Sequence, residues 1–216
     1  MENWGAVTTR EESVFYNNHM SLLEKRRALN IAHEFAHIWF GNLLTTSSWN
    51  QFWLNEGFAR FMDLKAVDIY SEYDQTEESR FSTLQSALWI DDEPSINPLV
   101  WEMRKPSDAY DILNNINYDK GGSVLKLVED LIGNDNMQMV LQTYIRKYQY
   151  RNVDSQDFVN TLQEFVNFNA TDFLNGFIKQ SGYPLISVSQ IHGRKVSLHK
   201  TRFLRMDQAY RDGRFA

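Results

Sequence analysis

The stretch IAHEFAHIWFGN, residues 31 to 42, places two histidines and a glutamate on consecutive turns of one predicted helix. Residues four positions apart in an α-helix lie one turn above each other on the same face. His33 and His37 therefore present their imidazoles to one point, and Glu34 lies beside them. A hydrophobic core needs none of these side chains, so the pattern indicates a chemical role.

A third ligand for a metal ion comes from a second segment. Zinc in a catalytic site takes three protein ligands and one open position for water. A lone His-Glu-x-x-His pattern can arise by chance, but WLNEGFAR, residues 53 to 60, agrees with it and offers Glu56, with 18 residues between His37 and Glu56. That separation suits a connection and a second helix packed antiparallel on the first. The sequence thus predicts one Zn²⁺ held by His33, His37 and Glu56.

This ligand set predicts metal-assisted hydrolysis of an amide. Two neutral imidazoles and one carboxylate leave the metal centre with a net positive charge, which can lower the pKa of a bound water to about 7. Glu34 adjoins a ligand without being needed as one, so it can take the proton of the water and return it to a leaving amine. The oxyanion that forms needs a further neutral donor. The other histidines, His19, His192 and His199, are predicted to lie on the surface.

The composition excludes several other classes of protein. Hydrophobic residues make up 43% of the 216 residues and aromatic residues 14%, so the chain can form a substantial core. A net charge of −6 argues against a nucleic-acid surface, which needs clustered Lys and Arg. Because there is no cysteine, any metal must be bound by His, Asp and Glu.

No segment of the sequence is typical of a membrane span. No apolar run of about 18 residues occurs, so no membrane span is predicted. Residues 1 to 12 lack the apolar run of a signal peptide, and the sequence leaves the compartment open.

The hydrophobic pattern predicts a mainly α-helical fold. Helices are predicted from Ser21 to about Gly41 and from about Gln51 to Tyr70, and residues 1–16 as extended chain or loop. Five residues of the second helix are predicted to face inward: Leu54, Phe58, Phe61, Met62 and Ile69. Further helices are predicted around 79–90, 107–116, 119–132, 135–149, 155–167 and 171–180.

The character of the sequence changes near Tyr183. Ile186, Val188, Val196 and Leu198 sit at alternate positions around a turn at residues 192–193, which predicts a β-hairpin. We therefore place one domain at residues 1–182 and the beginning of a β-rich domain, incomplete, at 183–216. About thirty residues are too few for a core of their own.

Four segments, in order, resemble the zinc aminopeptidases of the aminopeptidase N type. MENWG, residues 1 to 5, resembles the end of a Gly-Ala-Met-Glu-Asn motif followed by Trp-Gly. HEFAHIWFGN and WLNEGFA resemble the zinc elements of that family, including their 18-residue gap. INYDKGGSV, residues 116 to 124, resembles a Tyr-x-Lys-Gly segment, and GYPLISV with TRF resembles the passage into a β-sandwich domain. The resemblance implies a thermolysin-like (gluzincin) catalytic domain of a zinc metalloprotease.

The resemblance also implies roles for single residues. It assigns the zinc to His33, His37 and Glu56 and the general base to Glu34. Tyr118 matches a tyrosine that hydrogen-bonds the oxyanion of the transition state. Glu2 matches a glutamate that binds the free α-amine of the substrate, since a carboxylate pairs well with an ammonium. The partners implied are peptide substrates with a free N-terminus.

Some features depart from the family. Ile38 and Gln51 replace a common Gln and a frequent Asp, and we expect either change to alter contacts behind the metal ligands. An N-terminal β domain and a large C-terminal helical domain have no counterpart here, so we expect these flanking domains in the full protein and an isolated fragment that is inactive. Asn169 begins a glycosylation sequon, a pattern that often occurs by chance.

Two alternatives stand beside the aminopeptidase hypothesis. A bifunctional branch that also opens a lipid epoxide, as in leukotriene hydrolase, resembles Gly-Gly-Met-Glu-Asn-Pro, and MENWG argues against it. A non-catalytic relative that acts as a receptor or scaffold would have lost a ligand, the base or the tyrosine, and all of these are present.

Overall fold

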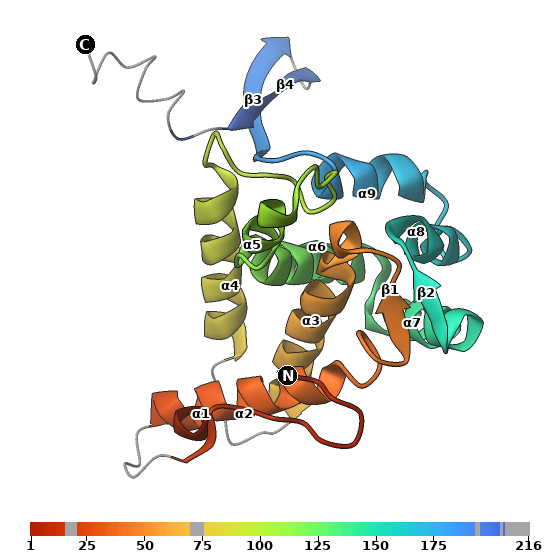
Figure 1. The fold of residues 1–216 in the computed structure, drawn as a ribbon. Helices are drawn as coiled ribbons and strands as arrows, with labels where there is room; N and C mark the ends of the chain where they lie inside the picture. Colours follow the sequence, from red (N-terminus) through yellow and green to blue (C-terminus); the bar gives the residue numbers. More distant parts are fainter. Residues whose placement is uncertain (16–20, 70–75, 193–194, 204, 206–216) are drawn as a thin grey trace.

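The computed structural model describes residues 1–15, 21–69, 76–192, 195–203 and 205. These residues form a mainly helical body with a β-hairpin that projects from one end of it, as predicted (Figure 1). The helices are α1 (Glu11–Val14), α2 (Ser21–Ala36), α3 (Trp53–Ile69), α4 (Thr76–Asp91), α5 (Ala109–Ile112), α6 (Ile116–Ile132), α7 (Asn134–Tyr148), α8 (Ser155–Gln163) and α9 (Ala170–Ile178). Short 3-10 turns, η1 (Trp49–Gln51) and η2 (Pro106–Asp108), precede α3 and α5. The strands are β1 (Leu44–Thr46), β2 (Arg151–Val153), β3 (Tyr183–His192) and β4 (Lys195–Phe203).

The core surrounds Phe58 of α3, which is fully buried. The Phe58 ring stacks on Phe40 with 4.7 Å between centroids and meets Phe158 of α8 edge-on at 5.0 Å. Tyr144 of α7 stacks on the same ring at 6.0 Å. Each aromatic pair of this kind adds about 0.5–1.5 kcal/mol beyond the burial of its area. The contacts fix α3 against the later helices and with it the first turn of α3, which carries Glu56.

Helices α3 and α6 cross in direct backbone contact at two glycines. A Cβ on Gly121 would lie 2.8 Å from the Cα of Gly57, and a Cβ on Gly57 would lie 2.9 Å from the Cα of Gly121. Real Cβ atoms do not come this close to another atom, so the approach requires glycine at both positions. The crossing brings the first turn of α6, with Tyr118, beside the first turn of α3.

A two-stranded parallel sheet holds the connection between α2 and α3. Leu44 in β1 pairs with Arg151 in β2, and Thr46 pairs with Val153. The Ser47 amide extends the pairing by donating to the carbonyl of Val153 at 2.8 Å. We did not predict this sheet, because a strand of three residues is too short to show a hydrophobic period.

The hairpin of β3 and β4 follows the prediction closely, with Val188 opposite Leu198. Both of these side chains are about two-thirds exposed, at 64% and 66%, so the hairpin has little apolar cover among the described residues. β3 begins at Tyr183, where we placed the domain boundary; the division into two domains remains a prediction.

A buried ion pair attaches the base of the hairpin to the helices. The ammonium of Lys120 lies 2.8 Å from Asp91 and also donates to the carbonyl of Gln180 at 2.9 Å. The amide of Gly182 donates to the other oxygen of Asp91 at 2.8 Å. Lys120 therefore connects α6, α4 and the chain that enters β3.

Several local predictions were wrong. Helix α2 ends at Ala36 rather than near Gly41, because the chain tightens there and the amide of Trp39 bonds the carbonyl of Ala36, three residues back. Ile69, predicted to face the core, is 84% exposed, since it ends α3 beyond the last buried residue, Val67. The helix predicted at 107–116 is reduced to η2 and α5, and α1 stands where we expected a loop.

The remaining helices agree with the predictions to within a few residues. His199 is exposed as predicted, whereas His19, Tyr70 and the side chain of His192 lie outside the described part of the chain. Asn169 caps α9 by accepting from the amide of Asp172 at 3.1 Å, which gives it a structural role. Across the described residues, no helix is both long enough and apolar enough to span a membrane.

Candidate metal centre

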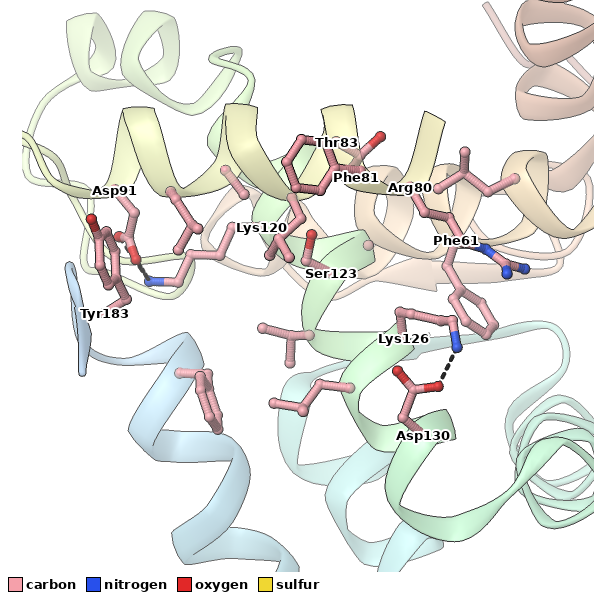
Figure 2. A pocket seen from close by; sticks show the side chains of 18 of the residues that line it. Phe61, Arg80, Phe81, Thr83, Asp91, Lys120, Ser123, Lys126, Asp130 and Tyr183 are labelled. Carbon is pink, nitrogen blue, oxygen red and sulfur yellow. Dashed lines mark hydrogen bonds and ion pairs between the residues drawn. The ribbon is translucent and has the colours of Figure 1, made fainter. Parts of the chain in front are cut away.

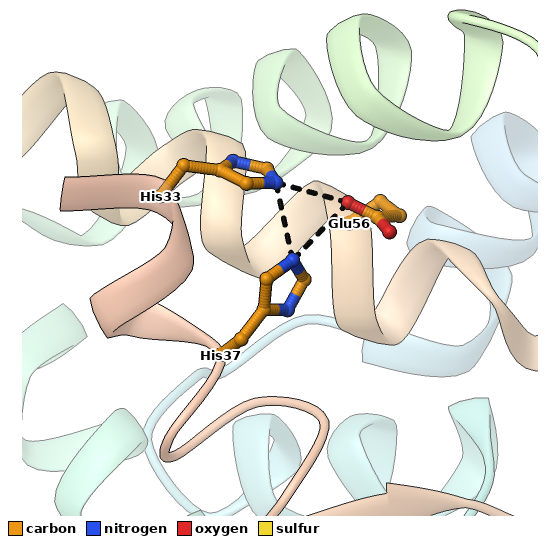
Figure 3. Close-up of side chains that lie close together, drawn as sticks. All are labelled: His33, His37 and Glu56. Carbon is orange, nitrogen blue, oxygen red and sulfur yellow. Dashed lines mark hydrogen bonds and ion pairs between the residues drawn. The ribbon is translucent and has the colours of Figure 1, made fainter. Parts of the chain in front are cut away.

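Three predicted ligands converge at the junction of α2 and α3 (Figure 3). His33 lies in the last turn of α2, His37 directly follows that helix, and Glu56 lies in the first turn of α3. The amide of His37 still bonds the carbonyl of His33 at 3.2 Å, which keeps the two imidazoles one turn apart. Their Nε2 atoms are 3.1 Å apart, and Glu56 Oε2 lies 3.0 Å from His33 Nε2 and 3.4 Å from His37 Nε2.

The outer nitrogen of each imidazole has its own acceptor. His33 Nδ1 donates to Asp63 Oδ2 at 3.1 Å, and His37 Nδ1 donates to the carbonyl of Phe40 at 2.9 Å. A carbonyl oxygen can only accept, so His37 must carry its hydrogen on Nδ1. In the neutral rings both Nε2 atoms therefore point a lone pair toward Glu56. Three electron-pair donors meet at one point, and such an arrangement is stable only around a cation.

The electrostatics agree with this requirement. Burial alone would lower the pKa of His33, but the hydrogen bonds to Asp63 and Glu56 outweigh it and raise that pKa to about 9. Burial alone would raise the pKa of Glu56, but the hydrogen bonds with His33 and His37 outweigh it and hold that pKa at about 2. Without a metal ion, a proton on His33 supplies the missing positive charge near neutral pH.

The donor set is suitable for zinc. Two imidazole nitrogens and one carboxylate oxygen are ligands that zinc takes in catalytic sites. Bonds of about 2.0–2.1 Å in a tetrahedral centre would separate the ligand atoms by roughly 3.3 Å. The observed separations are 3.0, 3.1 and 3.4 Å. His33, His37 and Glu56 also form a group whose ligand atoms all lie within 4.8 Å of one another.

The predicted base and the predicted amine-binding residue lie at the same centre. Glu2, Glu34 and His37 form a second group with ligand atoms within 4.8 Å of one another. Glu34 remains accessible, with 22% of its side chain exposed, and it accepts a hydrogen bond from the amino group of Met1 at 2.6 Å. Asn42 donates to the carbonyl of Glu2 and so ties the first residues of the chain to the turn after His37.

Tyr118 completes the set of predicted residues. Its ring lies nearly parallel to the imidazole of His33, with 5.8 Å between centroids and 19° between planes. Burial raises the pKa of Tyr118, and the carboxylates of Glu56, Glu2 and Glu34 raise it further. The phenol therefore stays neutral, as a hydrogen-bond donor, over the whole range of ordinary pH.

Sequence reasoning missed Asp63, the acceptor behind His33, which is completely buried. A signal was available, because Asp63 follows Glu56 by seven residues, two helical turns, and therefore lies on the same face of α3. Gln51 hydrogen-bonds away from the three predicted ligands. Its oxygen accepts instead from the amide and the hydroxyl of Ser155, at 3.0 and 2.5 Å, at the start of α8.

A separate pocket of about 570 Å³ lies between α3, α4 and α6 (Figure 2). Its lining is largely apolar and includes none of the three predicted metal ligands. Two cationic side chains of its lining have acidic partners: Lys120 pairs with Asp91, and Lys126 pairs with Asp130. Polar groups that are already paired make this pocket a weaker candidate than the centre at His33.

Fold and site together define a helical domain with a two-histidine, one-glutamate centre, the arrangement of a metallopeptidase. The chain belongs to the peptidase M1 family, since the family's domain, described as "Peptidase family M1 domain", matches residues 1–177. This membership confirms the family that the sequence motifs suggested.

Named relatives agree with this assignment. The chain is 34% identical over 205 residues to probable aminopeptidase 2 of Sulfurisphaera tokodaii, which covers 94% of this chain and 26% of that protein. It is 33% identical to leucyl aminopeptidase of Saccharolobus solfataricus, with the same two coverages. It is 35% identical to aminopeptidase M1-C of Oryza sativa subsp. japonica, covering 94% of this chain and 23% of that protein. The chain thus spans about a quarter of the length of these relatives.

Proposed function

We propose that this chain carries the catalytic centre of a zinc aminopeptidase, which removes the N-terminal residue from peptides. One observation supports the proposal above all others: two Nε2 lone pairs and the Glu56 carboxylate converge at 3.0–3.4 Å with no hydrogen to share in the neutral state. The names of the relatives indicate the reaction, and the donor set indicates the metal. When bound, Zn²⁺ would supply Lewis acidity, which makes a water molecule acidic near neutral pH.

Glu34 is the residue that we assign as general base. It follows the ligand His33 directly, yet its carboxylate is not one of the three that converge on the metal position. Because it is partly exposed, it can receive a proton from water and pass it to the leaving amine.

Tyr118 is assigned as the donor to the oxyanion. A neutral phenol held beside the ligands can donate a hydrogen bond to negative charge that develops on the carbonyl oxygen. Its raised pKa favours this role, since an ionised tyrosine would repel that charge.

Glu2 is assigned as the anchor for the amino group of the substrate. Its carboxylate lies within 4.8 Å of ligand atoms of Glu34 and His37, beside the proposed base and a proposed metal ligand. A charge-assisted hydrogen bond to a free ammonium would limit cleavage to the first peptide bond.

The test uses the complete protein that contains this chain, with Glu34→Gln as the variant and Glu12→Gln, an exposed glutamate of α1, as the matched control. Zinc content and hydrolysis of a panel of aminoacyl-arylamides are measured together. We expect one zinc per chain in all three proteins, and turnover that is lost only in Glu34→Gln. A wild-type chain that takes up no zinc would contradict the metal centre, and turnover in Glu34→Gln would contradict the assigned base.

A further inference from the structure

Arg60 connects two carboxylates that come from different helices. It lies one turn after Glu56 on α3, and its Nη1 donates to Asp63 Oδ2 at 3.1 Å. Its Nε lies 3.5 Å from Asp119 Oδ1 on α6. The same Oδ2 of Asp63 accepts from the ring of His33. Arg60 therefore stands directly behind the residue that orients a metal ligand.

Both carboxylates are inside the protein, where an unpaired negative charge is costly. Asp63 is fully buried and Asp119 is 8% exposed. Within the described part of the chain, Arg60 is the one lysine or arginine that forms an ion pair with either of them. If its charge were removed, two negative groups would remain near each other without a shared cation.

Two further contacts hold this arrangement in place. Ser86 of α4 donates to Asp119 Oδ2 at 2.5 Å, which leaves Oδ1 turned toward the guanidinium. Gly122 leaves room for the stem of Arg60, because a Cβ at that position would lie 2.7 Å from Arg60 Cγ. The site of the guanidinium is thus determined from three helices, α3, α4 and α6.

We propose that Arg60 is a positioning residue for the metal centre. It holds Asp63 against His33, while Asp119 anchors the guanidinium from α6. The inference rests on the proposed zinc function. It adds a residue that is not a ligand but affects how tightly the ligands bind the metal. A carboxylate behind a histidine ligand fixes the orientation of the ring and increases its basicity, so a displaced Asp63 weakens the metal site.

The test is the zinc dissociation constant of the chain, measured by competition with a chromophoric chelator. Arg60→Met keeps the apolar stem and removes the charge, and we expect zinc to bind about tenfold more weakly, as for other residues behind a metal ligand. Arg60→Lys, which can pair with one carboxylate but cannot bridge both, should show a smaller loss. Arg80→Met is the matched control, because Arg80 pairs with Asp68 and Glu77 instead.

A second substitution separates positioning from simple packing. In Arg60→Met the unpaired Asp119 opposes the charge of Asp63, so adding Asp119→Asn should recover most of the lost affinity. Asp119→Asn alone should change the affinity by less than Arg60→Met does. Thermal unfolding of each metal-free protein identifies variants that do not fold, and Arg60→Lys then replaces Arg60→Met in the comparison.

The outcomes distinguish this inference from the proposed function. Unchanged zinc affinity in Arg60→Met, or no recovery in the double variant, would overturn the role of Arg60 while the zinc aminopeptidase remains. A wild-type chain without zinc affinity would overturn both.

Discussion

The backbones of Gly57 and Gly121 touch where α3 crosses α6, and neither position has room for a methyl group. Glu56 directly precedes the first of these glycines, and Tyr118 lies one turn before the second. The distance between a proposed metal ligand and the proposed oxyanion donor is therefore set by two residues that take no part in the chemistry.

The first prediction concerns Gly121→Ala. The added methyl group must push α6 away from α3, which should cost about 1–3 kcal/mol of the free energy of unfolding. Hydrolysis should fall as well, because Tyr118 moves with α6. Gly176→Ala is the control, since Gly176 is also helical and has nothing within 4 Å of the added Cβ; its stability should stay equal or rise by about 0.5–1 kcal/mol. Urea unfolding of both variants measures the difference.

The second prediction concerns Tyr118→Phe. Loss of the hydroxyl should lower kcat by about 10²–10³, as for other single donors to an oxyanion, while KM and zinc content change little. Steady-state kinetics on an aminoacyl-arylamide, beside metal analysis, provide the measurement. Tyr110→Phe, a change at an 82% exposed tyrosine, controls for the substitution itself. If Tyr118→Phe kept the kcat of the unmodified protein, Tyr118 would not be the donor to the oxyanion.

The third prediction concerns Glu2→Gln. The amide keeps the shape of Glu2 but cannot neutralise an ammonium, so kcat/KM for substrates with a free amine should fall by about tenfold or more. Substrates with a blocked amine should be affected much less. Equal losses on both kinds of substrate would show that Glu2 does not bind the amine.

The fourth prediction concerns pH and the metal-free protein. The pKa of His33 is about 9 in the folded chain, above its ordinary value of 6.5. Because the folded chain binds this proton more tightly than the unfolded chain does, protonated His33 stabilises the fold. This contribution is complete below pH 6.5 and declines as the pH rises toward 9. The free energy of unfolding of the metal-free chain should therefore decrease over that window. The decrease should be smaller in His33→Gln, and equal slopes for the two proteins in urea titrations would contradict the assignment.

The three predicted metal ligands could be found from the sequence, but the contacts that hold them in place could not. The spacing of His33 and His37 is a local helical property, and Glu56 lies near them in the sequence, so pattern alone could bring these three residues together. The charge pair of Arg60 with Asp119 joins residues on different helices, and the pairing of β1 with β2 joins distant segments. No local period reports such contacts.

The same distinction explains the errors in the fold. Long helices with an apolar face, such as α3 and α7, were predicted to within a few residues because burial of that face determines them. The end of α2 was misplaced, since backbone bonds of the tightened turn, rather than a glycine, decide where the helix stops. Ile69 was misassigned because the hydrophobic pattern shows which face of the helix points inward. It does not show how far along the helix the neighbouring elements cover that face.

The pairing of β1 with β2 has a consequence for biosynthesis. All three proposed metal ligands leave the ribosome within one short piece of nascent chain, whereas β2, the strand that pairs with β1 after His37, is translated about a hundred residues later. The final spacing of the imidazoles then depends on β2, which has not been synthesised when the three residues emerge. We expect stable metallation to follow the synthesis of β2 rather than to guide the early folding of the chain.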